Sequence, residues 1–263
     1  PFNKQHTFVG LLPQFHSFGF TVLTVIPQSI GAVVIYQARF SPQKLIEIFK
    51  KWNPNIMVGI PSMYNAILKQ RNLDPDLFSN LEYAASGGEP LPHIIREEFE
   101  KISSCELHEG YGLTETAPVA NWALPPNNKP GTVGKPVPGV KEKIVSSEGK
   151  VLGVNEDGEV RIKGDNVMKG YYKDKEATDK VFDQDGYFCT GDMGRIDEDG
   201  YLSITGRIKE MLIISGENVF PREIEEILNR HPFVSDSGVV GKKDLMRGEV
   251  PIAFVELKEK EKD

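Results

Sequence analysis

The most informative stretch of the sequence is Glu109-Gly110-Tyr111-Gly112-Leu113-Thr114-Glu115-Thr116. Its two glycines lack side chains, so the backbone there can approach a ligand closely. Thr114 can donate a hydrogen bond to a phosphate oxygen, and the Glu115 carboxylate suits a hard cation such as magnesium. The pattern predicts a loop that binds phosphate and magnesium, although a glycine-rich turn before a helix explains the spacing about equally well.

On the N-terminal side of this stretch, short apolar runs alternate with segments of helical periodicity. The alternation is clearest in residues 42–52, 56–60 and 61–70, which read as helix, strand and helix. The apolar residues of the first helix fall on one face and are Leu45, Ile46, Phe49 and Trp52. This alternation, which extends to about Leu124, is typical of α/β layers.

From about Asn127 the sequence changes to short β-prone runs separated by turn-forming dipeptides. These dipeptides tolerate positive φ and are Glu148-Gly149, Asp157-Gly158, Asp185-Gly186 and Asp199-Gly200. They predict a small antiparallel β region. Past Gly206, a strand-like run over residues 211–214 precedes a helix that opens at Pro221. The residues expected on the inner face of that helix are Ile224, Ile227 and Leu228.

A second candidate site involves Asp192 and Arg207, on either side of the Asp199-Gly200 turn. Asp192 lies seven residues before Asp199, and Arg207 lies seven residues after Gly200, so a regular hairpin brings both side chains to the same end. A carboxylate can accept hydrogen bonds from two hydroxyls at once, which favours a clamp on a vicinal diol. The alternative interpretation is a structural salt bridge.

The composition excludes several classes of function. A net charge of −7 without a basic stripe argues against a nucleic-acid surface. The two cysteines, Cys105 and Cys189, support neither a disulfide scaffold nor a zinc site and fit the cytoplasm. The most apolar stretch, residues 21–36, is interrupted and too short to span a bilayer, and no signal peptide is expected. Peripheral membrane contact and the oligomeric state stay open.

Four motifs, in their order and at their intervals, resemble the adenylate-forming superfamily of acyl-CoA synthetases, adenylation domains and luciferases. They are Ser86-Gly87-Gly88-Glu89, Tyr111-Gly112-Leu113-Thr114-Glu115, Thr190-Gly191-Asp192 and Gly206-Arg207-Ile208-Lys209-Glu210. The resemblance extends from about Leu11 to the C-terminus, and residues 215–225 look much like the fatty acyl-CoA synthetase branch.

The resemblance implies an α/β multidomain fold. It consists of a large N-terminal domain of helix-flanked β-sheets, a β-barrel subdomain, and a small, mobile α+β C-terminal domain. We expect these parts at residues 1–124, 125–206 and 207–263, with the first and the last incomplete.

The resemblance also implies a role for each matching residue. Thr114 would contact the α-phosphate of ATP, Glu115 would bind magnesium, and His16 would lie beside the reacting carboxylate. The residues expected to contact the nucleotide are Gly87, Gly88, Glu89, Tyr111, Gly112, Asp192 and Arg207, the last two at its ribose. Lys209 is expected to be the pivot of a domain rotation. A solvated charge at a strand start is the alternative for that residue.

The implied substrates are a carboxylic acid, ATP and coenzyme A, with magnesium as cofactor. The family's Ser/Thr/Gly-rich phosphate loop and its C-terminal lysine segment are both absent, and the chain has no initiator Met. We therefore expect an excerpt of a longer AMP-forming ligase. The excerpt alone should be inactive, because adenylation depends on positioning and charge neutralisation.

The absence of a nearby carboxylate narrows the class of carboxylic acid expected as substrate. Residues 15–20 offer no carboxylate to pair with a substrate ammonium, and Leu113 occupies a position where peptide-synthetase domains usually carry Pro. The sequence therefore favours a medium- or long-chain fatty acid, with an aryl acid as the alternative. An acyl-AMP ligase that loads a carrier protein, a luciferase-like oxygenase and a non-catalytic nucleotide-binding protein are further alternatives.

Overall fold

The computed structural model describes residues 2–71, 73–74 and 76–258. The chain divides into two compact units. Unit 1 extends to Lys141 and also includes Lys163–Asp179, whereas unit 2 comprises Glu142–Ile162 and the chain from Lys180 onward. Unit 1 is therefore discontinuous in sequence. The three domains expected at residues 1–124, 125–206 and 207–263 stay a prediction.

Unit 1 is built on a seven-stranded sheet with the strand order β2-β1-β3-β4-β5-β6-β7. The strands are β1 (Thr7–Gly10), β2 (Val33–Tyr36), β3 (Ile56–Gly59), β4 (Tyr83–Ser86), β5 (Leu107–Tyr111), β6 (Asn121–Trp122) and β7 (Lys135–Pro136). Neighbouring strands from β2 to β5 are parallel, whereas β6 and β7 are antiparallel additions. Parallel strands that are covered on both faces read as continuous apolar runs, as Ile56-Met57-Val58 does.

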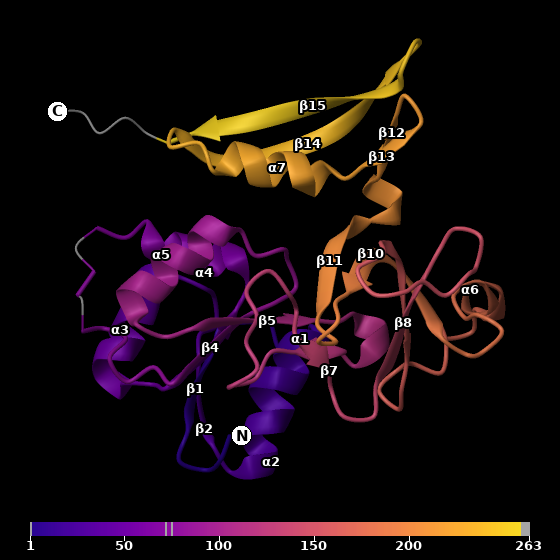
Figure 1. Cartoon of the computed structure of the whole chain (residues 1–263). Coiled ribbons are helices and arrows are strands. Elements are labelled where there is room, and N and C mark those ends of the chain that lie inside the picture. Colours follow the sequence, from indigo (N-terminus) through magenta and orange to yellow (C-terminus); the bar gives the residue numbers. More distant parts are fainter. Residues whose placement is uncertain (1, 72, 75, 259–263) are drawn as a thin grey trace. The chain divides into compact units, whose positions relative to one another are not determined.

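Helices cover both faces of this sheet (Figure 1). The connections β2–β3, β3–β4 and β4–β5 all run in the same direction along the sheet. The connection β1–β2 runs in the opposite direction. Because crossover connections are right-handed, the two sets of helices lie on opposite faces. The first set is α3 (Pro42–Trp52), α4 (Pro61–Leu68) and α5 (His93–Ser103), and the second is α1 (Ser17–Phe20), a π-helical turn (Thr21–Val25) and α2 (Ile26–Ile30). The predicted α/β class is confirmed.

The spacing of apolar residues in α3 and its capping residue explain most of the packing of this helix. Ser41 caps the helix by accepting a hydrogen bond from a backbone amide of its first turn at 3.5 Å. Leu45 and Phe49 are 1% and 2% exposed, as predicted. Trp52, which was expected on the same face, is 54% exposed. Trp52 is the last residue of the helix, and periodicity alone does not show whether a neighbour covers that turn.

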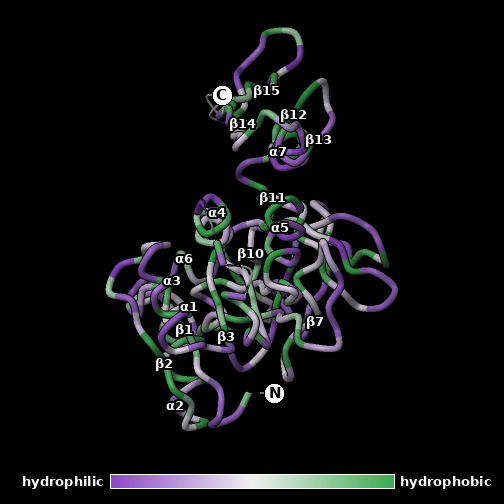
Figure 2. Tube along the Cα trace, turned by 90° about the vertical axis from the view of Figure 1, so that its left-hand side faces the viewer, coloured by the Kyte–Doolittle hydropathy of each residue, from purple (hydrophilic) through white to green (hydrophobic). Residues whose placement is uncertain are grey.

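The hydrophobic core of unit 1 lies around the central strands. Its largest fully buried side chains include Phe8, Met57, Tyr64 and Phe99. The Tyr64 hydroxyl donates to the Ala85 carbonyl at 2.7 Å, which satisfies its polar atom inside the core. Figure 2 shows the trace of β3 in hydrophobic colours, in keeping with its buried position. This packing fixes the strands whose ends carry the candidate residues.

The first sheet of unit 2 has the strand order β11-β10-β9-β8. Its strands are β8 (Lys141–Val145), β9 (Gly158–Lys163), β10 (Phe188–Ile196) and β11 (Leu202–Arg207), and α6 (Lys175–Lys180) precedes β10 in sequence. β10 is antiparallel to both β9 and β11. Gly200 has a φ of 82° in the turn after β10, as the Asp-Gly dipeptide predicts. The predicted antiparallel β region is confirmed. In the part of the chain where the family resemblance implies a β-barrel, the described strands β8 to β11 form this four-stranded sheet.

The second sheet of unit 2 has the order β13-β12-β15-β14, with α7 packed on β14. Its elements are β12 (Leu212–Ile214), β13 (Glu217–Val219), α7 (Pro221–Asn229), β14 (Val234–Asp244) and β15 (Gly248–Leu257). The strand near residues 211–214 and the helix start at Pro221 are confirmed. Ile227, expected on the inner face, is 69% exposed. Ile224 and Leu228 are half-buried.

None of the helices among the described residues combines the length and apolarity that crossing a membrane requires.

Candidate functional site

The candidate residues of unit 1 gather at one edge of its sheet. β1, β3, β4 and β5 are parallel, so their carboxyl ends lie together. The winding direction reverses between β1 and β3, and ligands of open α/β sheets bind outside the carboxyl ends at such a reversal. His16 follows β1, the pair Gly87-Gly88 follows β4, and Thr114 follows β5. Tyr111, the last residue of β5, is half-buried.

Gly87 and Gly88 leave space that side chains would fill. A Cβ atom on Gly87 would lie 3.1 Å from the Gly110 carbonyl oxygen and 3.2 Å from the Phe18 ring. Gly88 has a φ of 79°, a conformation that favours glycine. Just before them, Ser86 is 2% exposed, and its Oγ has no hydrogen-bond partner among the described residues. A buried hydroxyl in this state fits a site where a ligand supplies the partner.

His16 caps the N-terminus of α1 at the same edge. Its Nδ1 accepts a hydrogen bond from the Phe18 backbone amide at 3.2 Å, and its side chain is exposed. The Oγ of the next residue, Ser17, lies 3.4 Å from the Thr114 hydroxyl oxygen. His16 is therefore an exposed cap residue rather than a buried core residue. Glu89, after the glycine pair, is also exposed.

The turn that carries Thr114 is held by a residue that sequence reasoning did not identify. Thr116 is fully buried, and its hydroxyl donates to the Pro118 carbonyl at 2.7 Å and accepts from the Leu113 amide at 2.9 Å. Gly112 is required because a Cβ atom there would lie 1.7 Å from the same Pro118 oxygen. The segment is a single 3₁₀ turn (Thr114–Thr116), and Thr114 is exposed.

Glu115 is held by partners from a distant part of the sequence. The Tyr171 hydroxyl donates to a Glu115 carboxylate oxygen at 3.0 Å, and the Met168 amide donates to the Glu115 carbonyl at 2.7 Å. Burial, and then the hydrogen bond to Glu115, raise the pKa of Tyr171, so the phenol stays a donor at neutral pH. The two residues are 56 positions apart and no motif links them, so sequence reasoning missed Tyr171.

A magnesium site at Glu115 would be shared with a ligand. The described residues contain no group of three His, Cys, Asp or Glu side chains that could hold a metal ion. Magnesium is commonly bound by one or two carboxylates together with substrate phosphates. The Glu115 carboxylate, next to the exposed Thr114 hydroxyl, fits a site of that kind.

Asp192 and Arg207 meet in unit 2, as predicted, although the hairpin is not the regular one that was expected, because its register shifts between Met193 and Gly194. They are direct partners in the register of β10 and β11, and Arg207 Nε lies 3.0 Å from Asp192 Oδ1. The Asp192 side chain is 4% exposed, whereas that of Arg207 is 62% exposed. This geometry accommodates both a salt bridge and a diol clamp. Lys209, two residues further on, is exposed in a 3₁₀ turn (Ile208–Glu210).

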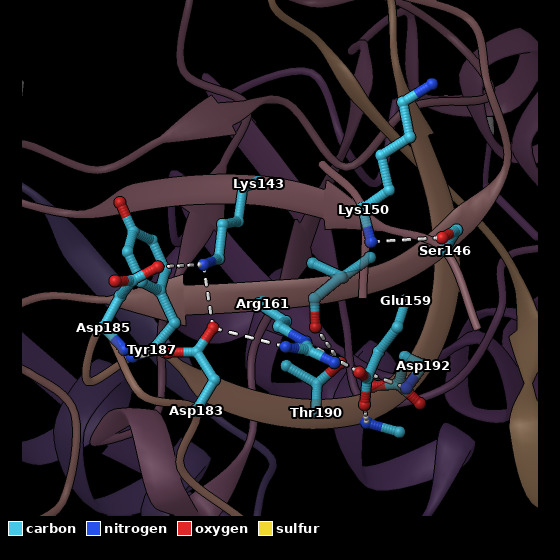
Figure 3. Close-up of polar contacts among 12 residues, drawn as sticks. Lys143, Ser146, Lys150, Glu159, Arg161, Asp183, Asp185, Tyr187, Thr190 and Asp192 are labelled. Carbon is cyan, nitrogen blue, oxygen red and sulfur yellow. Dashed lines mark hydrogen bonds and ion pairs between the residues drawn. The ribbon is translucent and has the colours of Figure 1, made fainter. Parts of the chain in front are cut away.

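A network of charged side chains crosses the same sheet (Figure 3). Asp183 pairs with Lys143 at 2.8 Å and with Arg161 at 3.3 Å, and Arg161 also pairs with Glu159 at 2.9 Å. Burial acts to raise the pKa of Asp183. The hydrogen bonds from Lys143, the Tyr187 amide and Arg161 outweigh it and lower the pKa from 3.8 to about 2.

We expect this network to make the unfolding free energy depend on pH in acid. The pKa of Asp183 is lower in the folded state than in the unfolded chain. Its contribution is therefore complete above pH 3.8 and is lost as the pH falls through about 2. Solvent screens pairs near the surface, so we expect a loss of about 1 kcal/mol.

Urea unfolding of the wild type and of Asp183→Asn measures this contribution. The difference in unfolding free energy between them should be present at neutral pH and should shrink as the pH approaches 2. A difference that stays constant over this range would contradict the assignment to Asp183.

Two family descriptions match this chain. Residues 1–172 match the family described as AMP-binding enzyme, and residues 223–263 match the AMP-binding enzyme C-terminal domain. The chain belongs to the AMP-binding enzyme family. The first match includes His16, the glycine pair and the Thr114 turn, and the family resemblance found from the motifs is confirmed.

Curated AMP-binding relatives include ligases for different acids. The chain is 37% identical over 255 residues to the long-chain-fatty-acid–CoA ligase of Bacillus subtilis, a match that covers 95% of the chain and 45% of the relative. It is also 37% identical over 267 residues to the probable 4-coumarate–CoA ligase 3 of Dictyostelium discoideum, covering 99% and 48%. The chain thus spans about half the length of the curated relatives it matches.

A solved structure has the same mixed α/β fold as this chain. The crystal structure of ATP-bound MatB from Rhodopseudomonas palustris matches with a TM-score of 0.93 and 31% identity. The match covers 98% of this chain and 51% of that chain.

Proposed function

We propose that this chain carries part of the machinery of an adenylate-forming acid–thiol ligase. In the first step, a carboxylate oxygen of the acid bonds to the α-phosphorus of ATP and pyrophosphate leaves. In the second step, the sulfur of coenzyme A bonds to the acyl carbon and AMP leaves. The observation that carries the proposal is the convergence of the His16 segment, the glycine pair and the Thr114 turn at the carboxyl edge of one sheet. The CoA-ligase relatives support it.

The unit 1 residues are proposed to handle the phosphate, the metal and the acyl group. Thr114 donates to the α-phosphate, and Glu115 holds magnesium with Tyr171 fixing the carboxylate. His16 orients the reacting carboxylate from its cap position. Donors and a cation that are already oriented stabilise charge as it develops, which is where most of the rate enhancement arises. The proposed nucleotide and acyl contacts are Gly87, Gly88, Glu89, Tyr111 and Gly112.

The unit 2 residues are proposed to bind the ribose and to allow domain rotation. Asp192 accepts hydrogen bonds from the two ribose hydroxyls, and Arg207 neutralises its charge at 3.0 Å. Lys209 is the proposed pivot between the two half-reactions. When bound, magnesium supplies charge neutralisation for the phosphates.

The proposed acid is a neutral fatty acid of medium or long chain. Its support is the lack of a carboxylate in residues 15–20 and the apolar side chains nearest Gly88, which are Ile60 and Phe18. Burying an unpaired substrate ammonium there would cost on the order of several kcal/mol. An aryl acid is the second candidate, because the 4-coumarate–CoA ligase relative is as similar as the fatty-acid relative, both at 37% identity.

The proposed setting is the cytoplasm, with small molecules rather than nucleic acid as partners. Cys105 and Cys189 are free thiols, which fits a reducing compartment. The net charge of −7 disfavours contact with phosphate backbones.

Asp192→Ala tests the nucleotide assignment in the full-length protein encoded by the reading frame that contains this sequence. Two lost hydrogen bonds at about 1 kcal/mol each should weaken AMP binding about 30-fold, measured by calorimetry. A melting curve of the same sample serves as control. A folded mutant with wild-type affinity would remove Asp192 from the site, and an unfolded mutant would favour the structural salt bridge.

The reaction itself is tested by acid-dependent exchange of pyrophosphate into ATP. Fatty acids of increasing length and 4-coumarate should be compared on one preparation. Exchange with neither class would overturn the proposed ligase activity.

A further inference from the structure

The strand that carries Asp192 is irregular at that point. In the pairing of β9 with β10, Cys189 lies opposite Arg161 and Met193 lies opposite Glu159. Three residues of β10, numbers 190–192, therefore stand against one residue of β9. Such a β-bulge takes backbone amides out of the ladder, so other groups must pair with them.

Side chains supply these contacts (Figure 3). Glu159 Oε1 accepts a hydrogen bond from the Gly191 amide at 3.3 Å. The Thr190 hydroxyl donates to the Val160 carbonyl at 2.7 Å and accepts from the Asp192 amide at 3.0 Å. Within the bulge, Gly191 has a φ of 72°, a left-handed conformation that favours glycine. The direction of the Asp192 side chain depends on these contacts.

Glu159 is itself fixed by a line of alternating charges across the sheet (Figure 3). Its second carboxylate oxygen pairs with Arg161 Nε at 2.9 Å, Arg161 pairs with Asp183 at 3.3 Å, and Asp183 pairs with Lys143 at 2.8 Å. These four side chains are between 11% and 19% exposed. Partly buried, doubly paired side chains have few alternative rotamers, so the line holds the Glu159 carboxylate against Gly191.

We propose that Glu159 and Arg161 are positioning residues for the diol-binding carboxylate. Arg161 orients Glu159, Glu159 holds the Gly191 amide, and the bulge fixed in this way aims Asp192 at the ribose hydroxyls. Neither residue touches the nucleotide. The inference rests on the proposed function, in which Asp192 accepts from those hydroxyls.

The test compares AMP with 2′-deoxy-AMP by calorimetry on the full-length protein. In the wild type, loss of one hydroxyl that bonds to the Asp192 carboxylate should weaken binding about fivefold. In E159A the misplaced Asp192 no longer distinguishes the two nucleotides, so the ratio of dissociation constants should fall to about two. A folded E159A with the wild-type ratio would overturn the proposal, because a purely structural role leaves this ratio unchanged.

A double-mutant cycle with Asp192 provides a second readout. If Glu159 acts through Asp192, E159A should weaken AMP binding in the wild type but not in the D192A background. Additive losses would mean that Glu159 acts elsewhere and would contradict the proposal. The matched control is D157A, which removes the ion pair of 3.4 Å between Arg195 of β10 and Asp157, the residue before β9. D157A should keep the wild-type nucleotide ratio.

The cycle also separates this inference from the proposed function. If folded D192A binds AMP as tightly as the wild type, the proposed ribose-binding role of Asp192 is contradicted. If D192A binds AMP more weakly but E159A binds it like the wild type, only the positioning role of Glu159 is contradicted. Should E159A fail to fold, E159Q takes its place. Its amide oxygen can accept from Gly191 but offers Arg161 no charge, so its nucleotide ratio should lie between those of the wild type and D192A. A wild-type ratio in E159Q would overturn the role of Arg161.

Discussion

Glu115→Gln should lower acid-dependent adenylate formation roughly 100-fold, the order of effect seen when one charge-stabilising contact is lost from a transition state. Glutamine has the same size and its amide oxygen can still accept from Tyr171, so the turn should stay folded. What it lacks is the negative charge that magnesium prefers. The measurement is pyrophosphate exchange over a range of magnesium concentrations, where the mutant should need more magnesium than the wild type.

Tyr171→Phe is the matched control for Glu115. It keeps the ring and removes only the hydroxyl that donates to the carboxylate at 3.0 Å. Losing this one hydrogen bond should reduce activity about tenfold or less, with a shift in magnesium requirement in the same direction. A Glu115→Gln enzyme whose magnesium dependence equals that of the wild type would show that Glu115 does not hold the metal.

Lys209→Pro should separate the two half-reactions. Proline fixes its own φ near −65° and disfavours the helical conformation of the residue before it, here Ile208 in the 3₁₀ turn. If the small domain pivots at this turn, a fixed backbone should hold one orientation, so we expect thioester formation from supplied acyl-AMP to fall roughly 100-fold. Adenylate formation with pyrophosphate release should be largely kept.

Contacts across this turn show what a rotation would break. Arg222 Nη1 donates to the Ile204 carbonyl at 2.8 Å, and the Phe220 ring packs where a Cβ atom on Gly206 would lie, 2.4 Å from it. Lys209→Ala, which removes the charge but keeps the backbone freedom, is the control and should leave both half-reactions nearly normal. Equal losses in both half-reactions of a folded Lys209→Pro enzyme, or no loss in either, would exclude residue 209 as a selective pivot.

The sequence was most informative where a short local pattern, such as a turn or a periodic run, determines which residues distant in sequence lie close together. Counting residues on either side of the Asp199-Gly200 turn predicted that Asp192 and Arg207 meet, and they do. The β-bulge between this pair and the turn, where the register shifts between Met193 and Gly194, was not predicted. The order of strands and helices likewise follows from periodicity, and parallel strands then bring the residues after β1, β4 and β5 to one edge.

Contacts that depend on tertiary packing could not be predicted in this way. Periodicity defines a helical face but not the neighbours that cover it, and so Trp52 and Ile227 are exposed on faces expected to be buried. The supports of the Thr114 turn are similar cases. Thr116 reads as one polar residue among several, and Tyr171 lies 56 residues from the carboxylate that it contacts.

The discontinuity of unit 1 has a consequence for synthesis on the ribosome. Tyr171 belongs to the Lys163–Asp179 segment, which is translated only after the first strands of unit 2. At ordinary translation rates, Glu115 waits roughly 3 to 11 s for a partner that is 56 residues downstream. During this interval the nascent chain presents the turn proposed to bind magnesium without the hydroxyl that fixes it. A nascent chain that stalls before residue 163 would therefore hold an N-terminal sheet whose carboxyl edge is unfinished, a natural target for chaperones.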